Sequence, residues 1–587
     1  MKAARQVEQV RCTVWPASIL RRVAGQSGAA WGMPANSVVF ERSAVTGSSL
    51  PARTVDWPGF PVSSVHCQTA LEELSTNARS HVQKLEVQLR ERCLSPGLTL
   101  AGTRLSDPGR FDTALATFQW HLSFCDLPDS FDLAGFSNEL VKTVGPVAPS
   151  ELAVVKPKWP SSQLVRSALE YFKKTHLYSV FPVVDVDETA QIIKDNELDL
   201  NDASIDTRSR ACLGAFTALI TGLRRDEPVF VAAGADPIAH VRAVLTLLPD
   251  LVLQDRSPRA LETLLMTALY ITPMGEPQTS EALLSLAVRI VFNTGANRAE
   301  TERKSPHLRA MFWLLYSFDK ENSLRRSQPP LIHDADCDLD LPSTYLFEYT
   351  DYHFFQNELS SHALLYPSDL RMALLKSRIY RLLYSVEAQR QSEARRLQRI
   401  RELDQELVNL KASFPRHCQP DDFAKGLVPD TLFHDLSLRG ANIHLGYYFC
   451  LTKIHSATAG GGMSPPASSI ELCYQAARST LLYIRRVQNC IIPETFWIYF
   501  QYLTTAVLAL YRRLLVASDV SQVREDVQIL EDTAGIFARL STTNAERGNF
   551  FAPYKIAENF VSKITALAKE SIMRSPLNGS TQEDRET

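Results

Sequence analysis

Cysteine is too sparse and too scattered in this sequence to build a zinc site from local spacing. The chain has ten cysteines in 587 residues, and the closest two, Cys473 and Cys490, are 17 residues apart, so no CxxC occurs. Zinc fingers, zinc ribbons and binuclear zinc clusters all need closely spaced cysteines. The low density is also unlike that of a disulfide-stapled secreted domain. We therefore expect reduced, mostly buried thiols in an intracellular protein.

The chain also lacks an excess of positive charge. It has 62 Lys and Arg against 65 Asp and Glu, which gives a net charge of −3 and no overall field that would attract nucleic acid. The basic-leaning residues 1–66 carry seven basic and three acidic side chains among many prolines and glycines. An arm of this kind cannot hold a base-reading element in register. We predict that this chain alone does not bind DNA sequence-specifically.

The sequence contains none of the common catalytic motifs. GxxxxGK[ST], GxGxxG, HExxH and GxSxG are all absent, and the histidines are scattered. The acidic run His333–Asp340 offers alternating carboxylates, which calcium can use, but it lacks the glycine and closing glutamate of an EF-hand. We interpret it as a solvated loop whose carboxylates cap a helix or pair with arginines. We nominate no catalytic, cofactor-binding or metal-binding residue and predict that the protein is not an enzyme.

Long apolar runs are scarce as well. The best candidate for a membrane span is Thr495–Tyr511, which has no charged residue but includes Gln501 and several threonines. It is short for a span, so we predict a buried core helix and no membrane association. The first eleven residues include four charged side chains and are not followed by an apolar run, so we do not expect a secretory signal.

The chain divides into five regions by composition and periodicity. We predict a disordered arm (1–66), an amphipathic helix that is a candidate for dimerisation (67–95), a linker and mixed segment (96–160), a helical regulatory domain (161–570) and a disordered tail (571–587). In the second region a heptad-like stripe is formed by Leu71, Ala78, Val82, Leu85 and Leu89. It has fewer heptads than the three or four that indicate a coiled coil. Packing of this helix on its own domain is the alternative to dimerisation.

Helical periodicity dominates from Ser161 to about Lys569. Apolar residues recur three and four positions apart, as in Leu261, Leu264, Leu265, Ala268 and Leu269. Strand-like alternation is scarce, and the short segment Val180–Val184 is the best candidate. We predict an all-α fold for this region.

An ordered series of short motifs then points to a known family. Its central pieces are Leu286–Arg289, Thr294–Arg298, Arg309–Asp319, Pro329-Pro330 and the acidic stretch that ends in Asp340-Leu341-Pro342. Outlying pieces include Tyr171-Phe172, Phe181–Asp185, Tyr447-Tyr448, Ile454-His455 and Trp497. This order resembles the fungal-specific transcription factor domain, the middle homology region of fungal zinc-cluster regulators, over roughly residues 160–570.

The sequence departs from that family in two ways. Thr294, Ala296 and Asn297 replace the leucines and histidine of a turn, and Leu308 and Ala310 replace arginines beside Arg309. The six-cysteine zinc cluster is missing. Either an upstream exon is absent from the gene model or the protein lacks the cluster naturally, and we favour the second. In either case the amphipathic helix occupies the place of the family's linker and dimerisation helix.

The central helix also has a physical interpretation that needs no family. Phe312, Trp313, Leu315 and Tyr316 concentrate large apolar area on about one turn, so we expect Trp313 to be buried. We expect Asp319 to pair with Arg289, Arg298 or Arg309, or else to face a ligand.

The resemblance implies a transcriptional regulator in the nucleus, with a biosynthetic gene cluster as a candidate target. It further implies a homodimer or a partner regulator, contact with DNA only indirectly or through a missing module, and a candidate small-molecule effector. A helical interaction protein that acts through a full regulator is the alternative, and a small-molecule binder or enzyme is the third hypothesis.

Overall fold

A computed structural model describes residues 111–125, 127–128, 130–144, 157–195, 199–202, 205–225, 227–254, 257–275, 277–346, 363–414, 419–420, 437–457, 466–488, 491–493, 495–515, 519–546 and 551–574. The expected arm (1–66), the expected amphipathic helix (67–95) and most of the expected tail lie outside these residues.

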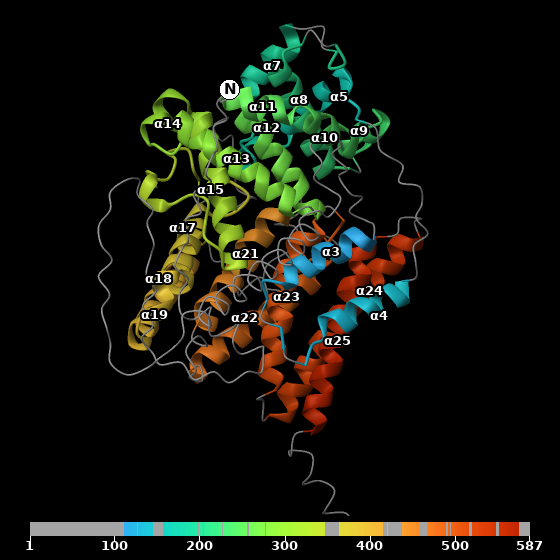
Figure 1. Ribbon diagram of the computed structural model, residues 1–587, viewed down its shortest axis with the longest axis vertical. Coiled ribbons are helices and arrows are strands. Elements are labelled where there is room, and N and C mark those ends of the chain that lie inside the picture. Colours follow the sequence, from blue (N-terminus) through green and yellow to red (C-terminus); the bar gives the residue numbers. More distant parts are fainter. Residues whose placement is uncertain are drawn as a thin grey trace, which may run out of the picture. The chain divides into compact units, whose positions relative to one another are not determined.

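The described residues are mainly helical (Figure 1). The helices up to the middle of the chain are α3 (Phe111–Leu122), α4 (Leu133–Val144), α5 (Ser162–Lys174), α6 (Leu177–Val180), α7 (Val186–Asp195), α8 (Thr207–Leu223), α9 (Pro228–Ala232), α10 (Pro237–Thr246), α11 (Leu248–Gln254), α12 (Pro258–Ile271), α13 (Pro277–Thr294), α14 (Glu300–Lys304) and α15 (Pro306–Arg326). The later helices are α17 (Leu370–Ile379), α18 (Val386–Gln389), α19 (Glu393–Ser413), α21 (Ser437–Ser456), α22 (Ala467–Arg486), α23 (Phe496–Leu514), α24 (Val520–Glu546) and α25 (Ala552–Arg574). Short 3₁₀ turns span Thr272–Met274 and Asp334–Asp336, and a π turn, η3, spans Tyr380–Tyr384.

Several helices begin where the sequence places a capping residue. Ser161 precedes α5, and its hydroxyl accepts a hydrogen bond from the backbone N–H of Leu164 at 3.3 Å. Asp236 and Ser257 cap α10 and α12 in the same way, and each is followed by a proline at the first helical position. A side-chain acceptor satisfies one of the unpaired N–H groups of the first turn, and proline has no N–H to satisfy. The expected start of the helical region at Ser161 therefore coincides with a capped helix.

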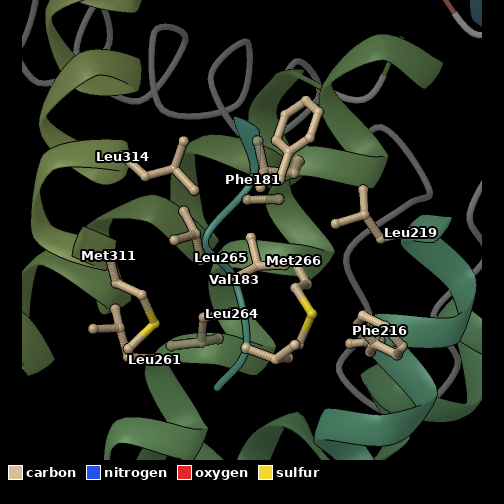
Figure 2. Packing of buried hydrophobic residues seen from close by; sticks show 14 of the residues in the cluster. Phe181, Val183, Phe216, Leu219, Leu261, Leu264, Leu265, Met266, Met311 and Leu314 are labelled. Atoms are coloured by element: carbon tan, nitrogen blue, oxygen red, sulfur yellow. The ribbon is translucent and has the colours of Figure 1, made fainter. Parts of the chain in front are cut away.

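The best strand candidate, Val180–Val184, does not pair as a strand. Val180 ends α6, and residues 181–184 after it are buried and belong to no regular element, with Val183 fully enclosed. Across the described part of the chain, the one β-type pairing is an isolated bridge between Tyr345 and Leu364. Helices pack against the apolar side chains of this segment. Figure 2 shows Phe181 and Val183 beside residues of α8 and α12. The all-α prediction is thus confirmed.

The buried apolar side chains form two cores. The first core contains residues of α5, α8, α10, α12, α13 and the first half of α15. The second core contains residues of α3, α4, α19 and α21 to α25. Both α15 and α17 contribute to each core: Leu314 and Leu370 belong to the first, whereas Leu324 and Met372 belong to the second. These two helices consequently join the cores.

The helical packing extends beyond the limits that the sequence suggests. Residues 96–160 were expected to be a linker and mixed segment, yet Phe118 of α3 and Phe136 of α4 are buried in the second core. Phe118 lies 5.5 Å from Phe560 of α25, measured between ring centroids. At the other end, α25 continues through Arg574, and Ile572 packs against the second core. The expected tail therefore begins with a few helical residues.

The apolar run Thr495–Tyr511 forms most of α23, which is buried along its length in the second core. Aromatic neighbours surround it; for example, Phe496 stacks on Phe500 with ring centroids 5.4 Å apart. Within the described residues, no helix is both long enough and apolar enough to span a bilayer. The prediction of a buried core helix is confirmed.

Candidate functional site

Helix α15 is the element that positions the residues singled out by the sequence. Pro306 occupies its first turn, and Ser327, with a positive φ of 52°, ends it. Residues from Leu308 to Ser317 are all buried, because neighbouring helices surround this half of the helix. Trp313 is fully buried, as predicted, and its ring lies 5.3 Å from that of Tyr316. The polar groups on such a helix must find partners inside the protein.

Arg309 fastens two loops to the first turns of α15. Its guanidinium donates to the carbonyls of Ala296 at 3.2 Å, of Asp340 at 3.3 Å and of Asp338. The guanidinium also lies 4.6 Å from the ring centroid of Phe312. Arg309, which is 1% exposed, thus ties the turn after α13 to the acidic run. A planar fork of donors suits several carbonyl acceptors at once.

The expected pairing of Asp319 with an arginine is wrong. The Asp319 carboxylate lies 3.2 Å from the ammonium of Lys320 and accepts backbone N–H bonds from Leu331 at 2.7 Å and Ile332 at 3.0 Å. Arg309 is ten residues earlier on the same helix, which corresponds to about 15 Å along its axis. Burial raises the pKa of Asp319, against the opposing effect of Lys320 and the two N–H groups. Asp319 therefore fixes the turn after α15.

The acidic run is anchored at both ends. Asp334 accepts hydrogen bonds from the hydroxyls of Tyr316 at 2.9 Å and Ser377 at 2.7 Å, and it lies 3.5 Å from the Lys320 ammonium. Asp338 accepts from the N–H of Ala299, which immediately precedes α14, so it caps that helix as expected. The run was also expected to pair with arginines through its carboxylates. Arg309 instead donates to backbone carbonyls of the run, those of Asp338 and Asp340. In the described part of the chain, no group of three or more His, Cys, Asp or Glu could hold a metal ion.

A second charged cluster lies where α15 and α17 pass between the two cores. We name Glu321, Arg325, Lys376, Gln501 and Tyr502 the junction network. Glu321 pairs with Arg325 at 2.5 Å and with Lys376, and it accepts from the Tyr502 hydroxyl at 3.2 Å. Arg325 also donates to the Gln501 side chain and lies 4.5 Å from the Tyr502 ring centroid. The network joins α15, α17 and α23.

Charge compensation keeps this network ionised. Burial alone would raise the pKa of Glu321, but Arg325 and Lys376 outweigh it and lower that pKa to about 2. The Lys376 side chain is only 2% exposed. Its burial favours the neutral amine, yet Glu321 reverses this effect and raises its pKa. Burial raises the pKa of Tyr502 to about 12, so this hydroxyl stays protonated and donates. One carboxylate is thus shared by two enclosed cations.

A cavity of about 520 Å³ opens beside the network. Its walls come from the end of α15, from α21, α22 and α23, and from the residues that follow α3. Arg325 belongs both to the cavity wall and to the junction network. Among binding sites for small molecules, a volume of this size is ordinary. The arrangement can therefore connect an event in the cavity to the contact between the cores.

Sequence reasoning singled out Arg309 to Asp319 but not the junction network or the cavity. Glu321 and Tyr502 are 181 residues apart, and no local pattern relates them. One signal was available, because Glu321 and Arg325 are four residues apart on a helix that is largely buried. Charges on such a helix have to be compensated by another element.

Comparison with known proteins identifies part of the chain. Residues 201–412 match the fungal specific transcription factor domain. An ABC-transporter-regulating transcription factor of Aspergillus fumigatus is 25% identical over 333 residues, which cover 51% of this chain and 36% of that protein. A protein of the same description from Aspergillus oryzae is 25% identical over 336 residues, again 51% of this chain and 36% of the relative.

An uncharacterized transcriptional regulatory protein of Schizosaccharomyces pombe is 24% identical over 251 residues, 40% of this chain and 32% of its own length. The chain therefore matches about a third of the length of each of these relatives, all of which are described as transcriptional regulators. The matched residues include the joining helices α15 and α17 and the Arg309 and Asp319 contacts. The match over residues 201–412 is to the same family that the order of motifs around α15 resembles.

Proposed function

We propose that this chain is a transcriptional regulator that acts in the nucleus of a fungus and is not an enzyme. The observation that carries the proposal is the match of residues 201–412 to a transcription factor domain, together with relatives described as transcriptional regulators. The helical region serves as the regulatory part, and the junction network passes a signal between its two cores.

The junction network suits the transmission of a signal because it is buried and its helices are joined by ion pairs. A buried ion pair costs desolvation and is stable only in a geometry that satisfies every partner. Glu321 of α15 contacts Lys376 of α17 and Tyr502 of α23, so a shift of α15 changes both contacts and a shift of α17 or α23 changes one of them. Packed cores respond to such shifts by adopting discrete arrangements.

Two modes of action are proposed. In the first, the chain acts as a homodimer or with a partner regulator and reaches DNA through a module of the zinc-cluster type. In the second, which is the alternative, it is an interaction protein that works entirely through a full regulator. One candidate set of target genes is a biosynthetic gene cluster of secondary metabolism. The other is genes for ABC transporters, by analogy with the Aspergillus relatives.

Transcript sequencing tests the proposal. A strain that lacks the gene, the same strain carrying a wild-type copy and the parent are compared in matched cultures. We expect a limited set of transcripts to change in the deletion strain and to recover with the wild-type copy. Enrichment of neighbouring biosynthetic genes would support the first target class, and enrichment of ABC-transporter genes the second. A deletion strain whose transcripts match those of the parent under every growth condition would contradict the proposal.

A further inference from the structure

A groove of about 620 Å³ lies at the end of α13. Helix α13, the turn after it and the chain that follows α15 supply its lining, and none of the described lining residues belongs to the junction network. Sites for small molecules bury most of the ligand's surface. Four residues that line this groove, Arg289, Arg298, Leu331 and Asp336, are exposed. The groove is therefore open enough to receive an extended segment of another chain.

The two arginines lie close together because a tight turn separates them. Arg289 is one turn before Phe292 on α13, so the two residues share a helix face. From Arg289 to the end of α13 the helix rises about 8 Å. In the turn that follows, Gly295 has a positive φ of 71°, and its carbonyl accepts a hydrogen bond from the backbone N–H of Arg298 at 3.0 Å. Arg289 on the helix and Arg298 on the turn therefore border one short groove.

Both guanidinium groups are available to an acidic partner. Within the described part of the chain, the side chains of Arg289 and Arg298 form no ion pair and no hydrogen bond. Asp336 is the one acidic side chain among the described lining residues, and it is not paired with either arginine. The lining thus has an excess of positive charge. A guanidinium group binds a carboxylate through two parallel hydrogen bonds.

The groove also offers apolar contact area. Leu331 is 45% exposed, although leucine is usually buried. Phe292 is partly exposed in the same groove, and Val288 lies one turn before it. Arginine and aromatic residues are enriched where proteins bind one another. Alternating acidic and apolar residues are typical of activation segments of transcriptional regulators. The charge and the apolar surface of the groove both complement a segment of that kind.

We propose that this groove binds a segment of another regulator in which acidic and apolar residues alternate. The carboxylates of the segment contact Arg289 and Arg298, and its apolar side chains pack on Phe292 and Leu331. This inference rests on the proposed function, because it names the partner chemistry of the mode in which the chain acts through a full regulator. Duplex DNA and a second copy of this chain are the other occupants that the experiment distinguishes.

Fluorescence anisotropy with the purified full-length chain at physiological salt tests the proposal. The probes are two labelled ten-residue peptides, one that alternates Asp with Leu and one that alternates Glu with Phe. In the control peptides serine replaces either every acidic residue or every apolar residue. We expect at least one acidic-apolar peptide to bind, and its controls to bind about tenfold more weakly, because each control lacks one of the two kinds of contact. A labelled short duplex DNA should also bind about tenfold more weakly.

Three variants locate the binding. Arg289→Glu with Arg298→Glu should weaken peptide binding about tenfold or more, and Asp336→Asn should strengthen it about threefold because it removes a like charge. Arg303→Glu with Lys304→Glu makes the same charge change on exposed residues of α14 that do not line the groove, and should bind like the wild type. Far-UV circular dichroism and melting temperature establish that each variant is folded.

Each outcome has one meaning. Binding of neither acidic-apolar peptide, equal binding of the serine controls, equally tight binding of DNA, or full affinity in folded Arg289→Glu/Arg298→Glu protein would overturn the assignment. Self-association that is lost in this double variant, measured by sedimentation velocity, would assign the groove to a second copy instead. All of these results would leave the proposed regulatory function standing, because the transcript comparison uses no peptide. Peptide binding with unchanged transcripts would support the groove assignment and contradict the regulator.

Discussion

Replacing Glu321 with glutamine is expected to lower the free energy of unfolding by about 3 kcal/mol, because it leaves two enclosed cations without their counter-charge. Lys376 is almost fully buried, and Arg325 shares the same carboxylate. Glutamine keeps the shape of the side chain, so the loss reports charge and not volume. Urea unfolding followed by far-UV circular dichroism measures it.

A matched control is available on the surface. Glu531 pairs with Lys569 of α25, and both side chains are more than 40% exposed. Exposed ion pairs contribute about 0–1 kcal/mol, so Glu531→Gln should shift the unfolding midpoint little. If Glu321→Gln and Glu531→Gln unfold at the same urea concentration, the junction network does not hold the cores together.

The pH dependence of the Glu321→Gln effect follows from the pKa of the carboxyl. In the folded protein this pKa is lowered from 4.5 to about 2. A lowered folded-state pKa contributes stability that is complete above the unfolded value and is lost as the pH falls toward the folded value. The stability difference between wild type and Glu321→Gln should thus be constant above about pH 5 and should narrow below pH 4.5.

Trp313→Ala is the second substitution with a large expected effect, a loss of about 3–5 kcal/mol of unfolding free energy. The side chain is fully buried between Phe312 and Tyr316, with ring centroids 5.5 Å and 5.3 Å away. Removing it leaves a cavity in a region where packed helices limit collapse. Thermal melting of the purified chain measures the loss.

Trp313→Phe provides the matched comparison. Within the described structure the buried indole N–H of Trp313 has no hydrogen-bond partner. Phenylalanine removes that unsatisfied donor while it keeps most of the apolar contacts, so the two effects partly cancel. The phenylalanine variant should melt much closer to wild type than the alanine variant. A Trp313→Ala protein that melts at the wild-type temperature would contradict the packing of α15.

The helical character and the core residues of α15 were predictable because they depend on local spacing. Apolar residues three and four positions apart specify a buried face, and capping residues such as Ser161 mark where helices begin. The burial of Trp313 follows from the same reasoning, since a cluster of large apolar side chains needs a core.

The partners of charged residues were not predictable in this way. Asp319 pairs with its neighbour Lys320 and with the turn after the helix, although three nearby arginines looked equally suitable in the sequence. The junction network brings together α15, α17 and α23, and the cavity depends on α21 and α22 as well. Such contacts are fixed by how helices pack, which a single sequence does not reveal.

The central claim, that this chain carries a transcriptional regulatory activity, is tested most directly by tethering it to DNA. The full chain is fused to a heterologous DNA-binding domain, and a reporter gene carrying that domain's sites is measured in a fungal host. We expect the fusion to change reporter expression relative to the DNA-binding domain alone, Glu321→Gln to reduce the change, and Glu531→Gln to preserve it. Reporter expression equal to that of the DNA-binding domain alone, with the wild-type fusion present at the same protein level, would contradict the claim.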